Sequence, residues 1–392
     1  MHRWRIVLTL LVGVLAAGCA ADESADSGGA PAQGGPVKIG LDIELSGPAS
    51  VQGEAYQRAA QLVAEQVNGK GGVLGRKVEL VIRDNKSDPA EALQVAKGLV
   101  ERDKVVGIVG GGSTPTTLSI ADFVENAQVP TVSMGSSGQI VNPPDRRRFV
   151  FKTPASTGQV VDVMAKDMAA RGIERIALLS VNNAYGDAGL DGLEQAAPAN
   201  GLTLVDSEKF EATDRDFTTQ VTKLKAQKPD ALVVWAIPPG AGIAARNAKD
   251  LGLGKPVYFD AGAGAELFLQ GAGDAAEGVF MVHPKVLVAD QVASAPNKQA
   301  MDEFHRAYTA RYGSYSGFAS YAADALNLLL QAITTAGGTD GPRVREALEQ
   351  LAYSGVTGQF QMAADNHNGL ATESLTVVTV KDGKWTLAGP AT

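Results

Sequence analysis

Strand-like and helix-like segments alternate along most of the chain, and this alternation restricts the possible folds more than any other feature. In the first series, short β-rich runs lie at residues 37–43, 78–82, 105–109 and 129–134. Helical segments separate them, and Glu54–Val67 repeats its apolar residues at helical spacing. Residues 105–109 are nearly all apolar, which is typical of a parallel strand covered on both faces.

A second series repeats the pattern, with strand-like runs at 173–180, 202–210, 231–235 and 256–260. Helical segments begin at about Asp187, after Asp214 and after Pro239. Two successive series predict an α/β fold made of two doubly wound parallel sheets. The C-terminal part then predicts helices at 298–312, 318–335 and 342–351, and strands at 358–360, 374–380 and 385–387. The pair Asp382-Gly383 predicts a hairpin turn between the last two strands.

The N-terminus has the pattern of an export signal. His2, Arg3 and Arg5 precede the apolar run 6–15, which is shorter than the roughly 20 residues needed to span a bilayer. Small residues then lead to Cys19, the only cysteine. The thiol could be incidental, but the segment resembles the lipobox of bacterial lipoproteins, with Ala16 at the position that is usually leucine. We therefore predict a signal peptide at 1–18 and lipidation at Cys19, and no disulfide is possible.

Composition limits the remaining possibilities. Residues 19–36 are rich in small, acidic, Gly and Pro residues and predict a flexible tether. Loss of Arg3 and Arg5 would leave 33 basic against 43 acidic residues, a net charge of −10 instead of −8. This acidity argues against nucleic acid as a partner. The triplet 146–148 is the one basic cluster and is most simply a solvated loop.

The clearest candidate for ligand contact is the loop Gly110–Thr114, which follows strand 105–109 and opens a helix at Pro115. Ligands of open parallel sheets sit at the carboxyl ends of strands, beside helix N-termini. Backbone N–H groups, helix dipole and the hydroxyls of Ser113 and Thr114 would suit a carboxylate. It is not a P-loop, because no Lys-Ser/Thr pair follows the glycines. The simpler alternative is a helix capped by Thr114.

Enzyme signatures are missing from the sequence. The four histidines, at 2, 283, 305 and 367, do not have the spacing of metal ligands, and no G-x-S-x-G motif occurs. No pair of carboxylates stands out as an acid/base couple. We predict that the chain is not an enzyme and uses neither a metal nor a cofactor.

Several phrases together resemble the type I periplasmic binding proteins of branched-chain amino-acid ABC transporters, the Leu/Ile/Val-binding family. They are VKIGLDIELSGPASVQGEAY at 37–56, NGKGGVLGRKVELVIRDNKSDPAEA at 68–92, VVGIVGGGSTPTTLSIA at 105–121, VPTVSMGSS at 129–137, NNAYGDAGLDGL at 182–193 and YSGVTGQFQM at 353–362. The resemblance covers almost the whole chain from Val37. It implies two lobes joined by three crossings, and hinge closure on a ligand.

The resemblance implies a division of the chain into parts. We place the crossings near Phe149–Pro154, Val279–Pro284 and Ser354–Gly358. Lobe I would then comprise residues 37–151 and 285–354. Lobe II would comprise residues 152–284 and 355–392.

The resemblance also implies ligand contacts. Gly135 and Ser137 fall where family loops hold the ligand's carboxylate and ammonium, and Tyr185 falls where the family has a ligand-contacting tyrosine. We also predict Ser136 and Ile237 as ligand contacts. The simpler alternatives are a polar turn for the loop at 133–137 and a core-packing side chain for Tyr185.

Two positions depart from the family pattern. The acidic residue that holds a ligand's ammonium corresponds to Ala261, although the adjacent Asp260 could substitute. A shift of one residue in a strand turns a side chain to the opposite face. Gln52 stands where the family has an aromatic wall. Both differences weaken the case for a branched-chain amino acid and leave other carboxylates, amides or ureas as ligands.

The resemblance implies an extracytoplasmic, lipid-anchored protein that binds a small solute in an interlobe cleft. It would deliver this amino acid, carboxylate or amide to an ABC transporter permease. The alternatives are a sensor or regulator on the same fold and a structural envelope lipoprotein.

Overall fold

Two large sheets organise the part of the chain that the computed structural model describes, residues 34–389. The described residues belong to one compact unit. The predicted signal peptide, Cys19 and nearly all of the predicted tether lie outside the described residues.

The first sheet has five strands in the order β2-β1-β3-β4-β5, and all of its neighbouring strands are parallel. The strands are β1 (Val37–Ile43), β2 (Val78–Asp84), β3 (Gly107–Gly110), β4 (Thr131–Ser133) and β5 (Val150–Lys152). The predicted strand 37–43 has the bounds of β1, and β3 is fully buried as its apolar sequence predicts.

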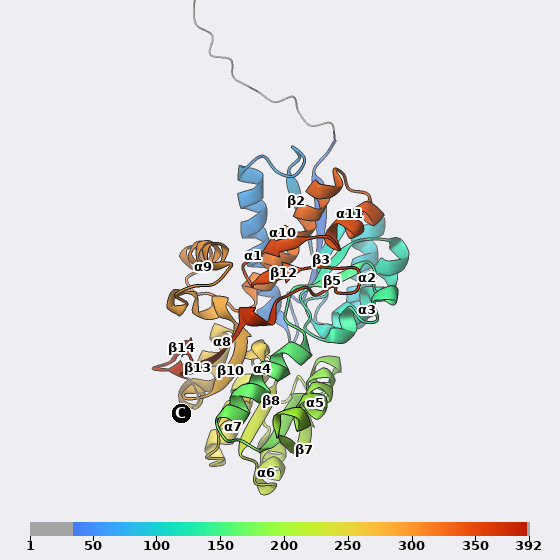
Figure 1. Cartoon of the computed structure of the whole chain (residues 1–392). Coiled ribbons are helices and arrows are strands. Elements are labelled where there is room, and N and C mark those ends of the chain that lie inside the picture. The colour runs from blue at the N-terminus through green and yellow to red at the C-terminus, as the bar shows by residue number, and fades with distance from the viewer. Residues whose placement is uncertain (1–33, 390–392) are drawn as a thin grey trace, which may run out of the picture. The chain divides into compact units, whose positions relative to one another are not determined.

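Helices from both ends of the chain accompany this sheet. They are α1 (Ser50–Gly69), α2 (Pro89–Glu101), α3 (Thr114–Ala127), α9 (Lys298–Tyr312), α10 (Ala319–Ala336) and α11 (Gly341–Leu348). Helix α2 packs on α3, and α10 packs between α1 and α11, so that late segments lie beside early ones (Figure 1). The Asp88 side chain accepts a hydrogen bond of 2.8 Å from Glu91 N at the start of α2, as its cap sequence predicts.

The second sheet has seven strands in the order β14-β13-β10-β9-β8-β6-β7. Its strands are β6 (Arg175–Val181), β7 (Thr203–Phe210), β8 (Ala231–Trp235), β9 (Val257–Phe259), β10 (Phe280–Pro284), β13 (Leu375–Lys381) and β14 (Lys384–Leu387). Its helices are α4 (Thr157–Ala170), α5 (Ala184–Ala196), α6 (Thr218–Ala226), α7 (Gly240–Asp250) and α8 (Glu266–Ala272).

The second sheet is not purely parallel. Strand β13 runs antiparallel to β10 and pairs with β14 through the turn at Asp382 and Gly383. Both turn residues have positive φ, 52° and 71°, as a two-residue hairpin of the predicted kind requires. The hairpin therefore adds an antiparallel edge to strands that are otherwise parallel.

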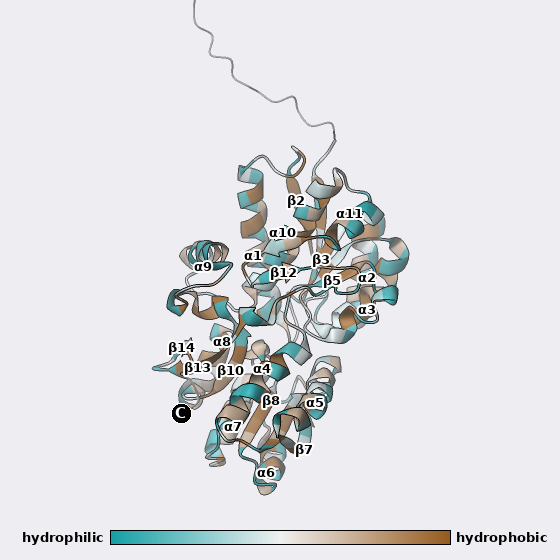
Figure 2. Cartoon of the chain, in the orientation of Figure 1, coloured by the Kyte–Doolittle hydropathy of each residue, from teal (hydrophilic) through white to brown (hydrophobic). Residues whose placement is uncertain are grey.

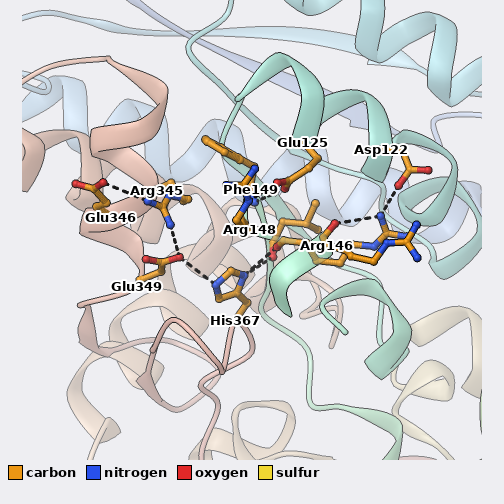
Figure 3. Close-up of polar contacts among 11 residues, drawn as sticks. Asp122, Glu125, Arg146, Arg148, Phe149, Arg345, Glu346, Glu349 and His367 are labelled. Carbon is orange, nitrogen blue, oxygen red and sulfur yellow. Dashed lines mark hydrogen bonds and ion pairs between the residues drawn. The ribbon is translucent and has the colours of Figure 1, made fainter. Parts of the chain in front are cut away.

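The chain passes between the two sheets after β5, after β10 and before β13. A small sheet of β11 (Ala352–Ser354) and β12 (Gln359–Gln361) precedes the last passage. The next segment stays beside β5, because His367 lies 3.0 Å from the carbonyl oxygens of both Arg147 and Val150. Figure 3 shows this ring between Glu349 of the α11 C-terminus and the 146–149 segment.

Short 3-10 helices complete the fold: η1 (Gly138–Ile140), η2 (Pro144–Arg146), η3 (Pro198–Asn200), η4 (Ala261–Ala263), η5 (Gly273–Ala276), η6 (Lys285–Gln291) and η7 (Thr372–Ser374). Figure 2 shows hydrophobic residues along strands such as β8 and hydrophilic ones along α9. Among the described residues, none of the helices has the length and apolarity to cross a bilayer.

Candidate functional site

A cavity of about 160 Å³ lies where the carboxyl ends of both sheets' strands meet. From the first sheet, residues after β1, β3, β4 and β5 line it, and from the second sheet, residues after β6, β7, β8 and β9 do so. Phe318 and Tyr321 at the start of α10 close one side. This is the place where open parallel α/β sheets bind ligands.

The loop before α3 contributes Gly112, Ser113 and Thr114 to the lining. The N-cap of α3 is Ser113, not Thr114, and Ser113 N donates to Thr116 Oγ1 at 3.2 Å. Thr114 Oγ1 instead accepts from Ser137 N at 3.3 Å. The positive end of the α3 dipole therefore faces the cavity.

Glu44 lies behind this loop and was not among the predicted site residues. It is fully buried, and its Oε1 accepts a hydrogen bond of 2.7 Å from Thr116 Oγ1. Burial raises its pKa, and its Oε2 has no protein partner. A β-carbon on Gly112 would lie 2.1 Å from that oxygen, so Gly112 is needed for the carboxyl to reach the helix end. The partners are 72 residues apart, and only the fold reveals them.

The loop after β4 also reaches the cavity, but not with all its predicted residues. Met134, Gly135 and Ser136 line it. Ser137 does not: its hydroxyl accepts a hydrogen bond from Gln139 N at 3.2 Å and caps η1. The placement of Ser137 therefore does not support a direct ligand contact, because its buried side chain lies outside the lining.

Asp260 and Ala261 both line the cavity. Strand β9 ends at Phe259 and η4 begins at Ala261, so the alternation of faces along a strand no longer applies at Asp260. The Asp260 Oδ2 atom accepts hydrogen bonds from the Tyr185 hydroxyl and, at 3.1 Å, from Gly262 N. Its Oδ1 is buried without a protein partner. Burial raises the pKa of Asp260 from 3.8 to about 7.

Aromatic and apolar side chains cover the rest of the second-sheet side. Tyr185, at the start of α5, packs against Trp235 with ring centroids 6.0 Å apart. Burial raises the pKa of Tyr185 well above its usual value, so the hydroxyl stays a donor to Asp260. The predicted contact Ile237 and the aromatic residue Phe210 also lie in the lining.

The polar groups of the lining define what it can bind. Asp260 is its one carboxylate, and it contains no lysine, arginine or histidine. Four buried polar atoms of the lining have no hydrogen-bond partner in the protein: Gln52 Oε1, Thr157 Oγ1, Trp235 Nε1 and Asp260 Oδ1. A cationic or N–H group would suit Asp260, while a carboxylate would depend on backbone N–H groups and hydroxyls. Within residues 34–389, no cluster of three His, Cys, Asp or Glu residues could hold a metal ion.

The sequence pattern of the periplasmic binding proteins matches residues 36–384, almost all of the described chain. The chain belongs to this family. Its members are substrate-binding proteins that work outside the cytoplasm, so the predicted family, the α/β fold and the absence of enzymatic function are confirmed.

Known proteins similar to this periplasmic binding protein include amino-acid binders. A leucine-, isoleucine-, valine-, threonine- and alanine-binding protein of Pseudomonas aeruginosa is 28% identical over 83% of this chain and 85% of its own length. A solved extracellular ligand-binding receptor from Rhodopseudomonas palustris has a TM-score of 0.84 at 25% identity, covering 91% of this chain and 100% of its own. The isoleucine complex of LivJ from Streptococcus pneumoniae has a TM-score of 0.79 at 26% identity, covering 89% and 97%.

Proposed function

We propose that this periplasmic binding protein captures an α-amino acid in the cavity between its two sheets. The ammonium would pair with Asp260, and the carboxylate would accept hydrogen bonds at the α3 N-terminus and the Gly135-Ser136 loop. The other proposed ligand contacts are Gln52, Ser113, Thr114, Tyr185, Ile237 and Ala261. Ser137 would act only by shaping its loop.

The observation that carries the proposal is the free Oδ1 atom of Asp260. A buried carboxylate without a full set of partners is costly, and a charged hydrogen-bond donor from the ligand would offset that cost. A ligand with a second anionic group in place of the ammonium is disfavoured, because the lining has no cationic side chain to pair with it. The solved relative named for its isoleucine complex and the relative named for five amino acids support the same ligand class.

The proposal includes the protein's place in the cell. Lipidation at Cys19 and a tether to residue 36 would hold the binding unit near the membrane, where it would deliver its ligand to an ABC transporter permease. A protein that carries two acyl chains is held at a membrane far more firmly than a protein with a single acyl chain. Lobe I would comprise 37–151 and 285 to about 370, because the contacts of His367 with the first sheet favour moving the last crossing from the predicted 354–358 to 370–375. Lobe II would then contain 152–284 and the chain from about 375.

A thermal-shift series on the full chain tests the ligand class. Leucine is compared with 4-methylpentanoate, which lacks the ammonium, and with 3-methylbutylamine, which lacks the carboxylate; threonine and asparagine extend the amino-acid set. A ligand at 100 times its Kd should stabilise the protein by about 2.7 kcal/mol. We expect at least one amino acid to raise the Tm and both truncated analogues to fail. Equal stabilisation by 4-methylpentanoate would contradict the role of Asp260.

A further inference from the structure

Two uncharged polar side chains in the cavity lining have no role in holding an amino acid's ammonium or carboxylate in the proposal above. They are Gln52 on α1 and Thr157 at the start of α4. Gln52 is 9% exposed and Thr157 is 6% exposed. The Gln52 Oε1 and Thr157 Oγ1 atoms have no hydrogen-bond partner in the protein.

The chemistry of Gln52 Oε1 restricts what can pair with it. A carbonyl oxygen only accepts hydrogen bonds, so a ligand carboxylate cannot satisfy it. Aliphatic side chains have no donor. Asp260 belongs to the second sheet and Gln52 to the helix after β1 of the first, so these two acceptors approach the cavity from different sheets. With the ammonium assigned to Asp260 in the proposed function, the ligand's side chain is the part left to supply a donor to Gln52.

We infer that the cavity selects an α-amino acid whose side chain carries an uncharged hydrogen-bond donor, an amide or a hydroxyl, over one with a branched aliphatic side chain. Gln52 is the specificity-determining residue, and Thr157 provides a second polar contact. The inference rests on the proposed function, because it concerns the side-chain end of the same amino-acid site.

The size of the effect follows from leaving polar groups unpaired. A site built to hydrogen-bond a ligand group rejects an analogue of the same shape that lacks this group, because its own buried polar atoms stay unpaired. For one neutral acceptor we expect a discrimination of about tenfold or more. The cavity volume does not decide the choice, since asparagine has the shape of leucine, and threonine that of valine.

These two pairs of equal shape provide the test. Calorimetric titrations of the full chain measure the Kd of asparagine and leucine, and of threonine and valine. In the pair that binds more tightly, we expect the polar member to bind about tenfold more tightly or better. Gln52→Leu should reduce this ratio to about one or invert it, and Thr157→Val should reduce it in part. Gln57→Leu, on the same helix but outside the lining, should leave it unchanged.

The outcomes separate the inference from the proposed function. Tighter binding of the aliphatic members by the native chain would overturn the inference and leave the amino-acid site intact. An equal loss of affinity for the polar and the aliphatic member in Gln52→Leu would also overturn the inference, since that result would place Gln52 at the ammonium. Binding of no member of either pair would overturn both proposals. The Tm of each variant is measured first, and Thr157→Val provides the comparison if Gln52→Leu does not fold.

Discussion

Asp260 lies in the cavity lining with one carboxyl oxygen hydrogen-bonded to Tyr185 and Gly262 and the other without a partner in the protein. Its neighbour Ala261 occupies the position where the family places an acid, and alternation along a strand would turn Asp260 away. The structure brings Asp260 to the cavity because β9 ends one residue earlier. The sequence predicts contacts at both Asp260 and Ala261 but leaves the facing of Asp260 open, because it depends on where a three-residue strand stops, and strand ends are hard to infer from local sequence.

We predict that Asp260→Asn weakens amino-acid binding by about a hundredfold, because the ligand's ammonium loses its counter-charge. Calorimetric titration measures the loss. The control is Glu266→Gln, which removes an exposed carboxylate six residues away and should leave the Kd unchanged. Equal affinity in Asp260→Asn and the native chain would show that Asp260 does not hold the ligand.

The same substitution should stabilise the ligand-free protein at pH 8. The pKa of Asp260 is raised from 3.8 to about 7 in the folded chain, so folding binds a proton between these values and stability falls as pH rises through them. Above pH 7 the folded chain carries the full cost of the buried charge, and asparagine removes it. The Tm of Asp260→Asn should exceed that of the native chain at pH 8 and equal it near pH 3.5. A lower Tm at pH 8 would contradict this.

Ligand affinity should also depend on pH. An ammonium pairs with the ionised form of Asp260, whose pKa is about 7 without ligand. The affinity should therefore fall as pH drops from 7, by roughly tenfold per pH unit once Asp260 is protonated. Titrations between pH 5 and 8 measure this slope, and a flat profile would mean that the carboxyl does not pair with the ligand.

At the scale of elements, the loop after β4 shows the difference between a residue near a site and a residue in it. Ser137 caps η1 through its hydroxyl, whereas Ser136 lines the cavity. We predict that Ser137→Ala lowers stability by about 1 kcal/mol through loss of the cap and changes the Kd by less than about threefold. Urea unfolding and titration separate the two effects. A large loss of affinity at unchanged stability would restore Ser137 as a ligand contact.

Helix α10 fixes the loop between β11 and β12. Asp324 accepts hydrogen bonds of 2.7 Å from Val356 N and 2.6 Å from Thr357 N, and burial raises its pKa to about 6. Asp324→Ala would leave two buried backbone N–H groups unpaired, so we expect a loss of about 3 kcal/mol in the free energy of unfolding. The exposed Gln331→Ala on the same helix is the control. A loss below about 1 kcal/mol would mean that the loop finds other partners.

Elements with a strong local signal could be predicted from the sequence. The bounds of β1, β8 and α9 agree with the predictions, and Asp88 caps α2 as its motif indicates. Contacts between distant segments could not be predicted. Examples are the hydrogen bond from Thr116 to Glu44 and the position of His367 beside β5, since no local pattern encodes pairings 72 or 217 residues apart.

At the scale of the whole binding unit, the cavity exists only because strand ends of both sheets meet at it. A bound ligand should therefore slow amide hydrogen exchange on both sides together, at residues 111–117 and 260–265. Helix α6, which is outside the lining, should be unaffected. Protection confined to one side would contradict capture between the sheets.

The most direct test of the account is calorimetric titration of the full chain with its best-binding amino acid from the thermal-shift series, for the native protein and Asp260→Asn. The account predicts one ligand per chain in the native protein and a loss of affinity of about a hundredfold in the variant. A native chain that binds no amino acid, or a variant that binds with native affinity, would contradict it.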